Sequence, residues 1–138
     1  MVTYGSIEIT VLDVYRHDRI VPGGAYYYTP NPGYMIIDLV VKIQNLGNTP
    51  PSIKWGDLHV IEQDGERSNT EFAGFRRTGK GERVNPLEIQ YDSVSQNSPL
   101  EFNYAIYLRV IFVIKDKTEQ IILFGIQDSP LIQFTVRR

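Results

Sequence analysis

Residues 34–48 form the pattern that most constrains the fold of this chain: Tyr-Met-Ile-Ile-Asp-Leu-Val-Val-Lys-Ile-Gln-Asn-Leu-Gly-Asn. From Ile37 to Ile43 an apolar side chain stands at every second position, and Asp38 and Lys42 stand between them. Side chains that alternate in this way line the two faces of a β-strand. The pattern predicts a long strand with one face in a core and the other toward solvent, ended by an Asn-Leu-Gly-Asn turn.

Shorter alternating runs predict that the rest of the chain is also built of strands. Glycine, proline and Asx turns separate these runs, and Asp64-Gly65 is a strong hairpin signal. No run shows a 3.6-residue period over a dozen residues, so no sizeable helix is expected. Seven or eight strands joined in this way are typical of an all-β sandwich. The further runs lie at residues 7–11, 58–61, 72–75, 87–91, 102–114, 120–126 and 132–136.

Length and composition indicate one globular domain over residues 1–138. A net charge of −2 lacks the basic excess of nucleic-acid binders, so no nucleic-acid partner is expected. The chain has no cysteine, which removes disulfides and thiol chemistry but fits both oxidising and reducing compartments. No segment reaches the ~18 to 20 apolar residues that cross a bilayer. No membrane span is expected within the chain, and an anchor upstream of Met1 is left open.

The best candidate for a contact surface is the long excursion at residues 16–33, which the proline residues Pro30 and Pro32 exclude from regular strand pairing. It holds three consecutive tyrosines, and a fourth follows at its end. Tyrosine offers a large contact area at little entropic cost. Docking on a partner and folding back over a sandwich edge are about equally favoured for these residues: Tyr26, Tyr27, Tyr28 and Tyr34.

A weaker candidate is a local basic cluster. Its members are Arg76, Arg77, Lys80 and Arg83, which lie close together in an otherwise slightly acidic chain. Such a cluster can dock an acidic surface, but a solvated hairpin is the favoured interpretation.

Residues for catalysis or metal binding are sparse, and we expect neither a catalytic site, a cofactor nor a metal. His59 alternates with apolar neighbours and is predicted to face solvent, whereas His17 lacks a second ligand at metal spacing. No phosphate loop, nucleophile elbow or His-Glu-x-x-His motif occurs. Trp55 is expected to plug the core or one end. A shared calcium site is conceivable for the acidic residues near strand ends, but Asx turns explain each of them: Asp57, Asp64, Asp92, Asp116 and Asp128.

The order of these segments resembles a family of immunoglobulin-like sandwiches of unknown function in bacterial and archaeal lipoproteins and envelope proteins. The resemblance implies an immunoglobulin-like sandwich of two mainly antiparallel sheets. More loosely, the strand that ends in Asn-x-Gly is similar to those of archaellum-associated ectodomains. The segments that carry the family resemblance are residues 5–11, 33–47, 58–65 and 104–113.

Together these observations predict a non-catalytic binding or scaffolding module that contacts a protein partner, or a second copy, through a loop or a sheet edge. The resemblance implies a location in the cell envelope, and a cytoplasmic location stays open. An archaeal surface-filament ectodomain that binds the surface layer is one alternative. A carbohydrate-binding module, with exposed aromatic rings, and a metal-dependent hydrolase are the others.

Overall fold

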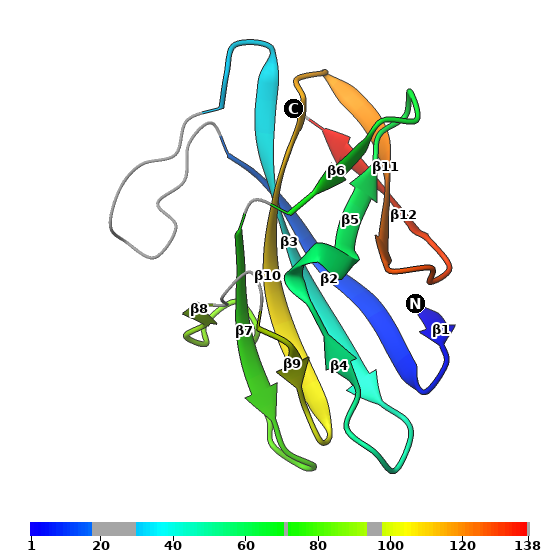
Figure 1. The fold of residues 1–138 in the computed structure, drawn as a ribbon. Coiled ribbons are helices and arrows are strands. Elements are labelled where there is room, and N and C mark those ends of the chain that lie inside the picture. The colour runs from blue at the N-terminus through cyan, green and yellow to red at the C-terminus, as the bar shows by residue number, and fades with distance from the viewer. Residues whose placement is uncertain (18–29, 71, 94–97, 138) are drawn as a thin grey trace.

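The computed structural model describes residues 1–17, 30–70, 72–93 and 98–137. These residues form strands in two main layers, with one short 3₁₀ turn at Trp55–Asp57 (Figure 1). No helix in these ranges is long and apolar enough to cross a membrane. The strands are β1 (Val2–Tyr4), β2 (Ile7–His17), β3 (Tyr34–Asn45), β4 (Ser52–Ile53), β5 (Leu58–Ile61), β6 (Arg67–Asn69), β7 (Phe72–Thr78), β8 (Asp92–Ser93), β9 (Leu100–Glu101), β10 (Ala105–Lys115), β11 (Glu119–Ile126) and β12 (Ile132–Arg137).

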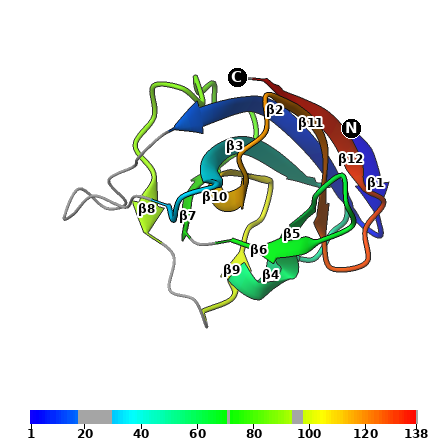
Figure 2. The same cartoon turned by 90° about the horizontal axis from the view of Figure 1, so that it is seen from above.

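The two layers have the strand order of an immunoglobulin-like sandwich. One sheet runs β1-β2-β3-β10-β7-β8 and the other β12-β11-β5-β6, with antiparallel pairing throughout. The first, second, fifth and fourth main strands therefore share one layer, as in the ABED sheet of immunoglobulin domains. Seen from above, the two layers curve around a common interior (Figure 2). The predicted fold class is confirmed.

The core lies between the layers and consists of the inward-facing residue of each alternating pair. Phe112 of β10 and Phe124 of β11 meet there across the sheets, edge to face, with ring centroids 6.2 Å apart. Both rings are fully buried. Edge-to-face aromatic pairs add to the stabilisation gained by burial. This contact fastens the two sheets together near their centres.

The predicted long strand is confirmed as β3, but it is not half-buried. Its outer face carries Ile36 and Val40, which are both 0% exposed, and Asp38, which is 2% exposed. Ile111 of the neighbouring β10, opposite Asp38 in the strand register, is also buried on this face. A second, smaller apolar cluster thus covers the outside of the six-stranded sheet.

Two segments differ from the expected pattern. Residues 87–91 form turns rather than a strand, because Asn85 and Pro86 start a compact turn there. The Asn85 carbonyl accepts the N–H groups of Glu88 and Ile89 at 3.0 and 3.1 Å, and its side-chain Oδ1 accepts that of Leu87. The expected strand at 102–114 begins only at Ala105.

The first excursion also begins later than expected, because β2 continues to His17. A register shift between Val11 and Asp13 lets this strand follow β3 over its whole length. His17 therefore lies on the sheet, opposite Ile36.

The predicted hairpin at Asp64-Gly65 is present between β5 and β6. Gly65 has φ of 91°, a left-handed conformation that glycine adopts without strain, and its N–H donates to the Glu62 carbonyl at 2.8 Å. The Asp64 carboxylate accepts the N–H of Glu66 at 3.0 Å.

We expect the Phe112→Ala variant to lower the free energy of unfolding by about 3–5 kcal/mol, because the change empties a fully buried ring position between the sheets. Ile121→Ala is the matched control: this side chain is 40% exposed on the outside of the other sheet, and its loss should cost less than about 1 kcal/mol. Urea denaturation measures both values. Equal losses in the two variants would contradict the central role of the ring contact.

Candidate functional site

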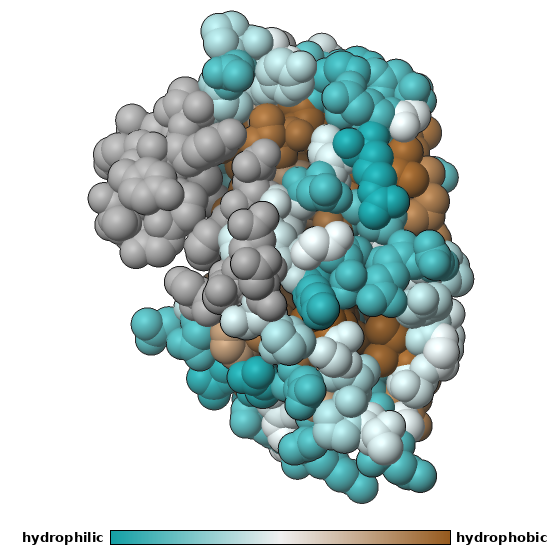
Figure 3. Space-filling model, viewed as in Figure 1, coloured by the Kyte–Doolittle hydropathy of each residue, from teal (hydrophilic) through white to brown (hydrophobic). Residues whose placement is uncertain are grey.

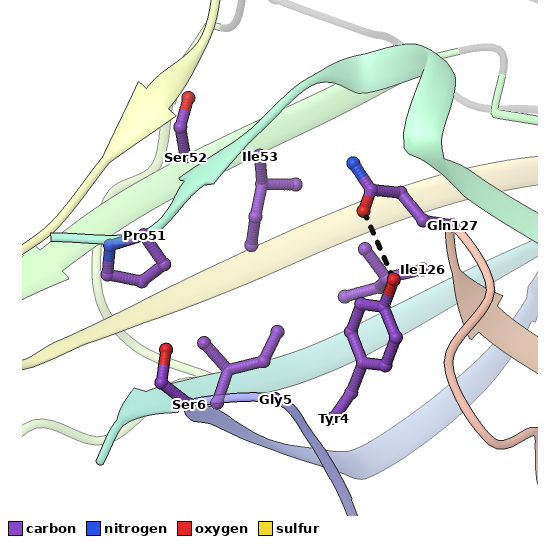
Figure 4. A pocket seen from close by; sticks show the side chains of 9 residues that line it. Tyr4, Gly5, Ser6, Pro51, Ser52, Ile53, Ile126 and Gln127 are labelled. Atoms are coloured by element: carbon purple, nitrogen blue, oxygen red, sulfur yellow. Dashed lines mark hydrogen bonds between the residues drawn. The ribbon is translucent and has the colours of Figure 1, made fainter. Parts of the chain in front are cut away.

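The candidate site is a pocket of about 400 Å³ at one end of the sandwich. The turn between β1 and β2, strand β4 and the end of β11 surround it (Figure 4). Its lining consists of Tyr4, Gly5, Ser6, Ile7, Pro51, Ser52, Ile53, Ile126 and Gln127.

The floor of the pocket is aliphatic. Ile7, Ile53 and Ile126 come from β2, β4 and β11, and each is at most 6% exposed. Because they come from three different sheets, the floor exists only in the folded chain. Pro51 adds an apolar ring beside them (Figure 4).

The Asn-Leu-Gly-Asn turn after β3 holds one wall of the pocket in place. The N–H of Leu46 donates to the Ser6 carbonyl at 2.7 Å. A Cβ atom on Gly47 would lie 3.1 Å from that of Ser6, so a larger residue would crowd this contact. Asn45 closes the turn by accepting the N–H of Gly47 at 2.8 Å.

The rim is polar but uncharged. The Tyr4 hydroxyl points toward Gln127 and donates to its Oε1 at 3.5 Å (Figure 4). Ser6 and Ser52 are the other polar residues of the lining. The lining therefore combines an apolar floor with a few hydrogen-bonding groups, which is the usual composition of a binding pocket.

Gln127 has a strained backbone. Its φ of 53° is the left-handed conformation, which costs a residue other than glycine about 1–2 kcal/mol. Its N–H donates to the carbonyl of Asp57 at 2.8 Å, and this bond helps to hold the conformation. Strained residues of this kind concentrate at functional sites.

The described residues that line the pocket carry uncharged side chains. Its lining has no carboxylate, imidazole, ammonium or guanidinium group. The pocket can therefore select a ligand by shape and hydrogen bonding.

A separate charged cluster lies on the outer face of the six-stranded sheet. Arg109 of β10 holds the buried Asp38 carboxylate with two groups: its Nε donates to Oδ1 at 3.2 Å, and its Nη2 donates to Oδ2. His17 Nε2 lies 3.3 Å from the same Oδ2. A carboxylate only accepts, so this nitrogen carries the proton.

Aromatic rings surround the cluster. The guanidinium carbon of Arg109 lies 5.7 Å from the centroid of the Tyr15 ring. Tyr91 packs closely on Gly74 of β7, the strand next to β10. A Cβ atom added to Gly74 would lie 3.0 Å from the Cβ of Tyr91. Burial raises the pKa of Tyr91 to about 12. Both oxygens of Asp38 are engaged, so the cluster fastens strands β2, β3 and β10 to one another.

The predicted tyrosine surface falls mostly outside the described residues. Tyr26, Tyr27 and Tyr28 lie there, so their role stays a prediction. Tyr34 begins β3 and is 42% exposed.

The predicted basic cluster is divided by the pleat of β7, because the neighbouring residues Arg76 and Arg77 project to opposite faces of the strand. Arg77 donates from Nε to the Glu101 carbonyl at 2.6 Å and lies over the Phe75 ring. Arg76 Nη2 is 3.9 Å from Glu82. Lys80 and Arg83 follow the strand and are exposed.

The expectation that His59 faces solvent was wrong. The residue lies on the outer face of β5 as predicted, but it is only 2% exposed. Leu131 covers this position, since its Cδ2 and the His59 ring both lie about 3 Å from where a Cβ on Gly125 would stand. Burial lowers the pKa of His59.

Among the described residues, one group of acidic side chains is close enough to share a metal ion: Glu62, Asp64 and Glu66 at the β5–β6 turn. The ammonium group of Lys115 already binds the Asp64 carboxylate, and it lies 2.5 Å from that of Glu66. Glu62 accepts the backbone N–H of Lys115 at 2.8 Å. The ammonium group of Lys115 therefore occupies this cluster. Its contacts join the β5–β6 turn to β10.

Trp55 does not offer a flat exposed ring for sugar stacking. It is half-buried and packs against the core, as predicted, and its Nε1 donates to the Thr70 carbonyl at 2.8 Å.

Sequence reasoning did not single out Tyr4, Gln127 or Arg109. Tyr4 and Gln127 gave no local signal, because the pocket brings together residues 123 positions apart. Asp38 did give a local signal, because it is the single charged residue in the apolar run from Met35 to Val41. Such a residue calls for a buried partner of opposite charge, and Arg109 stands on the adjoining strand.

Comparisons with known proteins support the fold. No family model matches the sequence, and no curated protein matches it. Among solved structures, an uncharacterised β-sandwich protein from Clostridium difficile 630 has a TM-score of 0.55 at 17% identity, covering 99% of this chain and 89% of that one. A conserved hypothetical protein from Bacillus anthracis has a TM-score of 0.56 at 14% identity, covering 95% and 89%.

A third similar structure belongs to a longer chain. It is a "putative lipoprotein" from Bacillus subtilis, with a TM-score of 0.52 at 12% identity. The match covers 95% of this chain and 36% of that chain. At these identities the likeness shows a shared β-sandwich fold.

We expect Arg109→Met to lower the free energy of unfolding by about 3–5 kcal/mol, because it leaves the buried Asp38 carboxylate without its main partner. Adding Asp38→Asn to this variant should recover part of the loss. Arg137→Met is the matched control: Arg137 and its partner Glu119 are well exposed, and the change should cost less than about 1 kcal/mol. Denaturant unfolding of the four proteins measures these values; equal losses for Arg109 and Arg137 would contradict a buried ion pair.

Acid titration should reveal the contact between Lys115 and Asp64. The ammonium group of Lys115 lowers the pKa of the Asp64 carboxyl below its usual value of 3.8. Because the folded pKa is the lower one, this contact stabilises the protein above pH 3.8, and the stabilisation is lost as the pH falls through the folded pKa. In Lys115→Met, carboxyl ¹³C NMR should show the Asp64 pKa rising toward 3.8. An unchanged Asp64 pKa would contradict the contact.

Proposed function

We propose that this chain is a non-catalytic binding module of the cell envelope, and that it contacts a protein partner through the end pocket. The observation that carries the proposal is the uncharged lining of a pocket with a rigid aliphatic floor. Such a site can hold an apolar group from a partner and orient it by hydrogen bonds, while its described lining has no carboxylate or imidazole to act as a general base.

The arrangement of charge in the molecule supports this choice. Carboxylates of both charged clusters are paired with basic side chains inside the fold: Asp38 with Arg109, and Asp64 and Glu66 with Lys115. Groups held in this way fasten neighbouring strands to one another. The exposed pocket is then the favoured place for contact with another molecule.

The envelope location is supported by fold similarity to the Bacillus subtilis protein and by the resemblance of the strand pattern to envelope sandwiches. A second contact surface is proposed at the tyrosine residues of the first excursion, Tyr26, Tyr27, Tyr28 and Tyr34. Tyr34 supports it through its exposure at the start of β3. Tyr34 does not line the pocket, so mutations of Tyr34 and of the pocket can be tested separately.

Site-specific photo-crosslinking in the native cell tests the proposal. A benzophenone amino acid in place of the exposed Ser52 stands at the pocket, and the same group in place of the exposed Lys117 stands at the β10–β11 turn as the matched control. We expect a covalent protein adduct from position 52, recovered in the envelope fraction, and at least a tenfold weaker adduct from position 117.

The tyrosine surface is tested in the same experiment by combining the crosslinker at Ser52 with Tyr34→Ala. An adduct that persists shows that the pocket acts without Tyr34. Equal adducts from positions 52 and 117, or an adduct found only in the cytosolic fraction, would contradict the proposed function.

A further inference from the structure

Strand β4 has an unpaired edge that borders the pocket. β4 pairs with β9 on one side, and these two strands form a separate small sheet. The β1–β2 turn lies on its other side, across the pocket (Figures 1 and 4). No strand in the described part of the chain pairs with this second edge.

The backbone at this edge can accept another strand. In an antiparallel pair, successive residues direct their N–H and C=O groups alternately toward the partner and away from it. One of the two residues Ser52 and Ile53 therefore directs both groups away from β9, to the side where the pocket lies. An extended peptide that supplied the matching groups would lengthen the small sheet by one strand.

The flanking sequence limits the length of such an addition. Pro51 lacks an N–H group, so the edge cannot be extended regularly toward residue 50, which is also proline. The 3₁₀ turn at Trp55–Asp57 ends the extended backbone on the other side. The edge therefore fits a short segment of a few residues rather than a full strand.

The pocket beside this edge supplies side-chain selectivity. Ile53 reaches into the pocket toward the β1–β2 turn (Figure 4), and the floor it forms with Ile7 and Ile126 suits an aliphatic side chain. Gln127 and Tyr4 offer an amide and a hydroxyl, which can hydrogen-bond to a peptide group. No charged side chain in the lining could pair with a chain terminus or an acidic or basic residue.

We propose that the pocket binds a short, uncharged, extended peptide segment of a partner protein, which pairs with the free edge of β4 and inserts one aliphatic side chain onto the isoleucine floor. This inference rests on the proposed function, because it names the ligand of the same pocket. It also gives the strained residue Gln127 a role, since the left-handed turn holds its amide at the rim.

Methyl NMR of the full chain tests the inference with a defined probe, the blocked peptide acetyl-Thr-Val-Thr-Val-Thr-amide. We expect saturable shifts of the methyl groups of Ile7, Ile53 and Ile126. The same peptide N-methylated at its three central residues cannot pair with β4 and should bind at least tenfold more weakly. The control variant is Tyr107→Phe, on the outer face of the six-stranded sheet. It should leave the peptide concentration at half-saturation unchanged.

Two variants examine the rim. Gln127→Gly removes the amide and relieves the left-handed backbone, so it should fold at least as well as the parent protein. Tyr4→Phe removes one hydroxyl. Each variant should raise the peptide concentration at half-saturation about fivefold, as expected for the loss of roughly one hydrogen bond. Unchanged half-saturation concentrations in both variants would contradict the role of the rim.

The outcomes separate this inference from the proposed function. Equal binding of the parent and N-methylated peptides would overturn strand addition. No saturable shift with either peptide, together with a specific adduct from the crosslinker at Ser52, would overturn the peptide class and leave the binding function standing. Failure of both experiments would overturn both proposals.

Discussion

The ion pair between Asp38 and Arg109 allows β3 to lie at the centre of the molecule with both faces buried. A strand that is covered on both sides normally carries only apolar residues on them. Here one carboxylate is buried, and its desolvation is offset by two hydrogen bonds from a guanidinium group and by the neighbouring imidazole of His17. The pair joins β3 to β10, and His17 joins it to β2. Polar contacts as well as apolar packing thus fix the register of the large sheet.

The space-filling view shows apolar areas between polar ones over the described part of the front face (Figure 3). On the outer face of β3, Ile36 and Val40 are fully buried, and Arg109 of β10 stands opposite Val40. Apolar surface remains accessible where the strand ends meet. The end pocket is such a place, because strands from different sheets diverge there and leave a space that no side chain fills.

The two ends of the sandwich differ in chemistry. At the end with the β5–β6 and β10–β11 turns, ion pairs close the structure: Lys115 binds two carboxylates, and Arg16 lies 2.5 Å from Asp116. The β1–β2 turn lies toward the other end (Figure 1), and the pocket beside it is lined by uncharged side chains among the described residues. Ion pairs hold the turns together at one end, and the uncharged lining of the pocket retains hydrogen-bonding groups that are available to a ligand. This division supports contact at the pocket end without assigning catalysis to either end.

The sequence by itself determined the strands whose side chains alternate over many residues, such as residues 34–45, and the turns whose residues act locally, such as Asp64-Gly65. Alternation and turn chemistry are properties of neighbouring residues, so they can be read along the chain. Residues 87–91 also alternate, yet the hydrogen bonds of Asn85 turned them away from strand pairing. Only the tertiary structure decided that Asp38 and His59 are buried, because what covers a strand face comes from distant segments. It also decided the pocket, since the contact between Tyr4 and Gln127 depends on how two sheets meet and on no pattern within either segment.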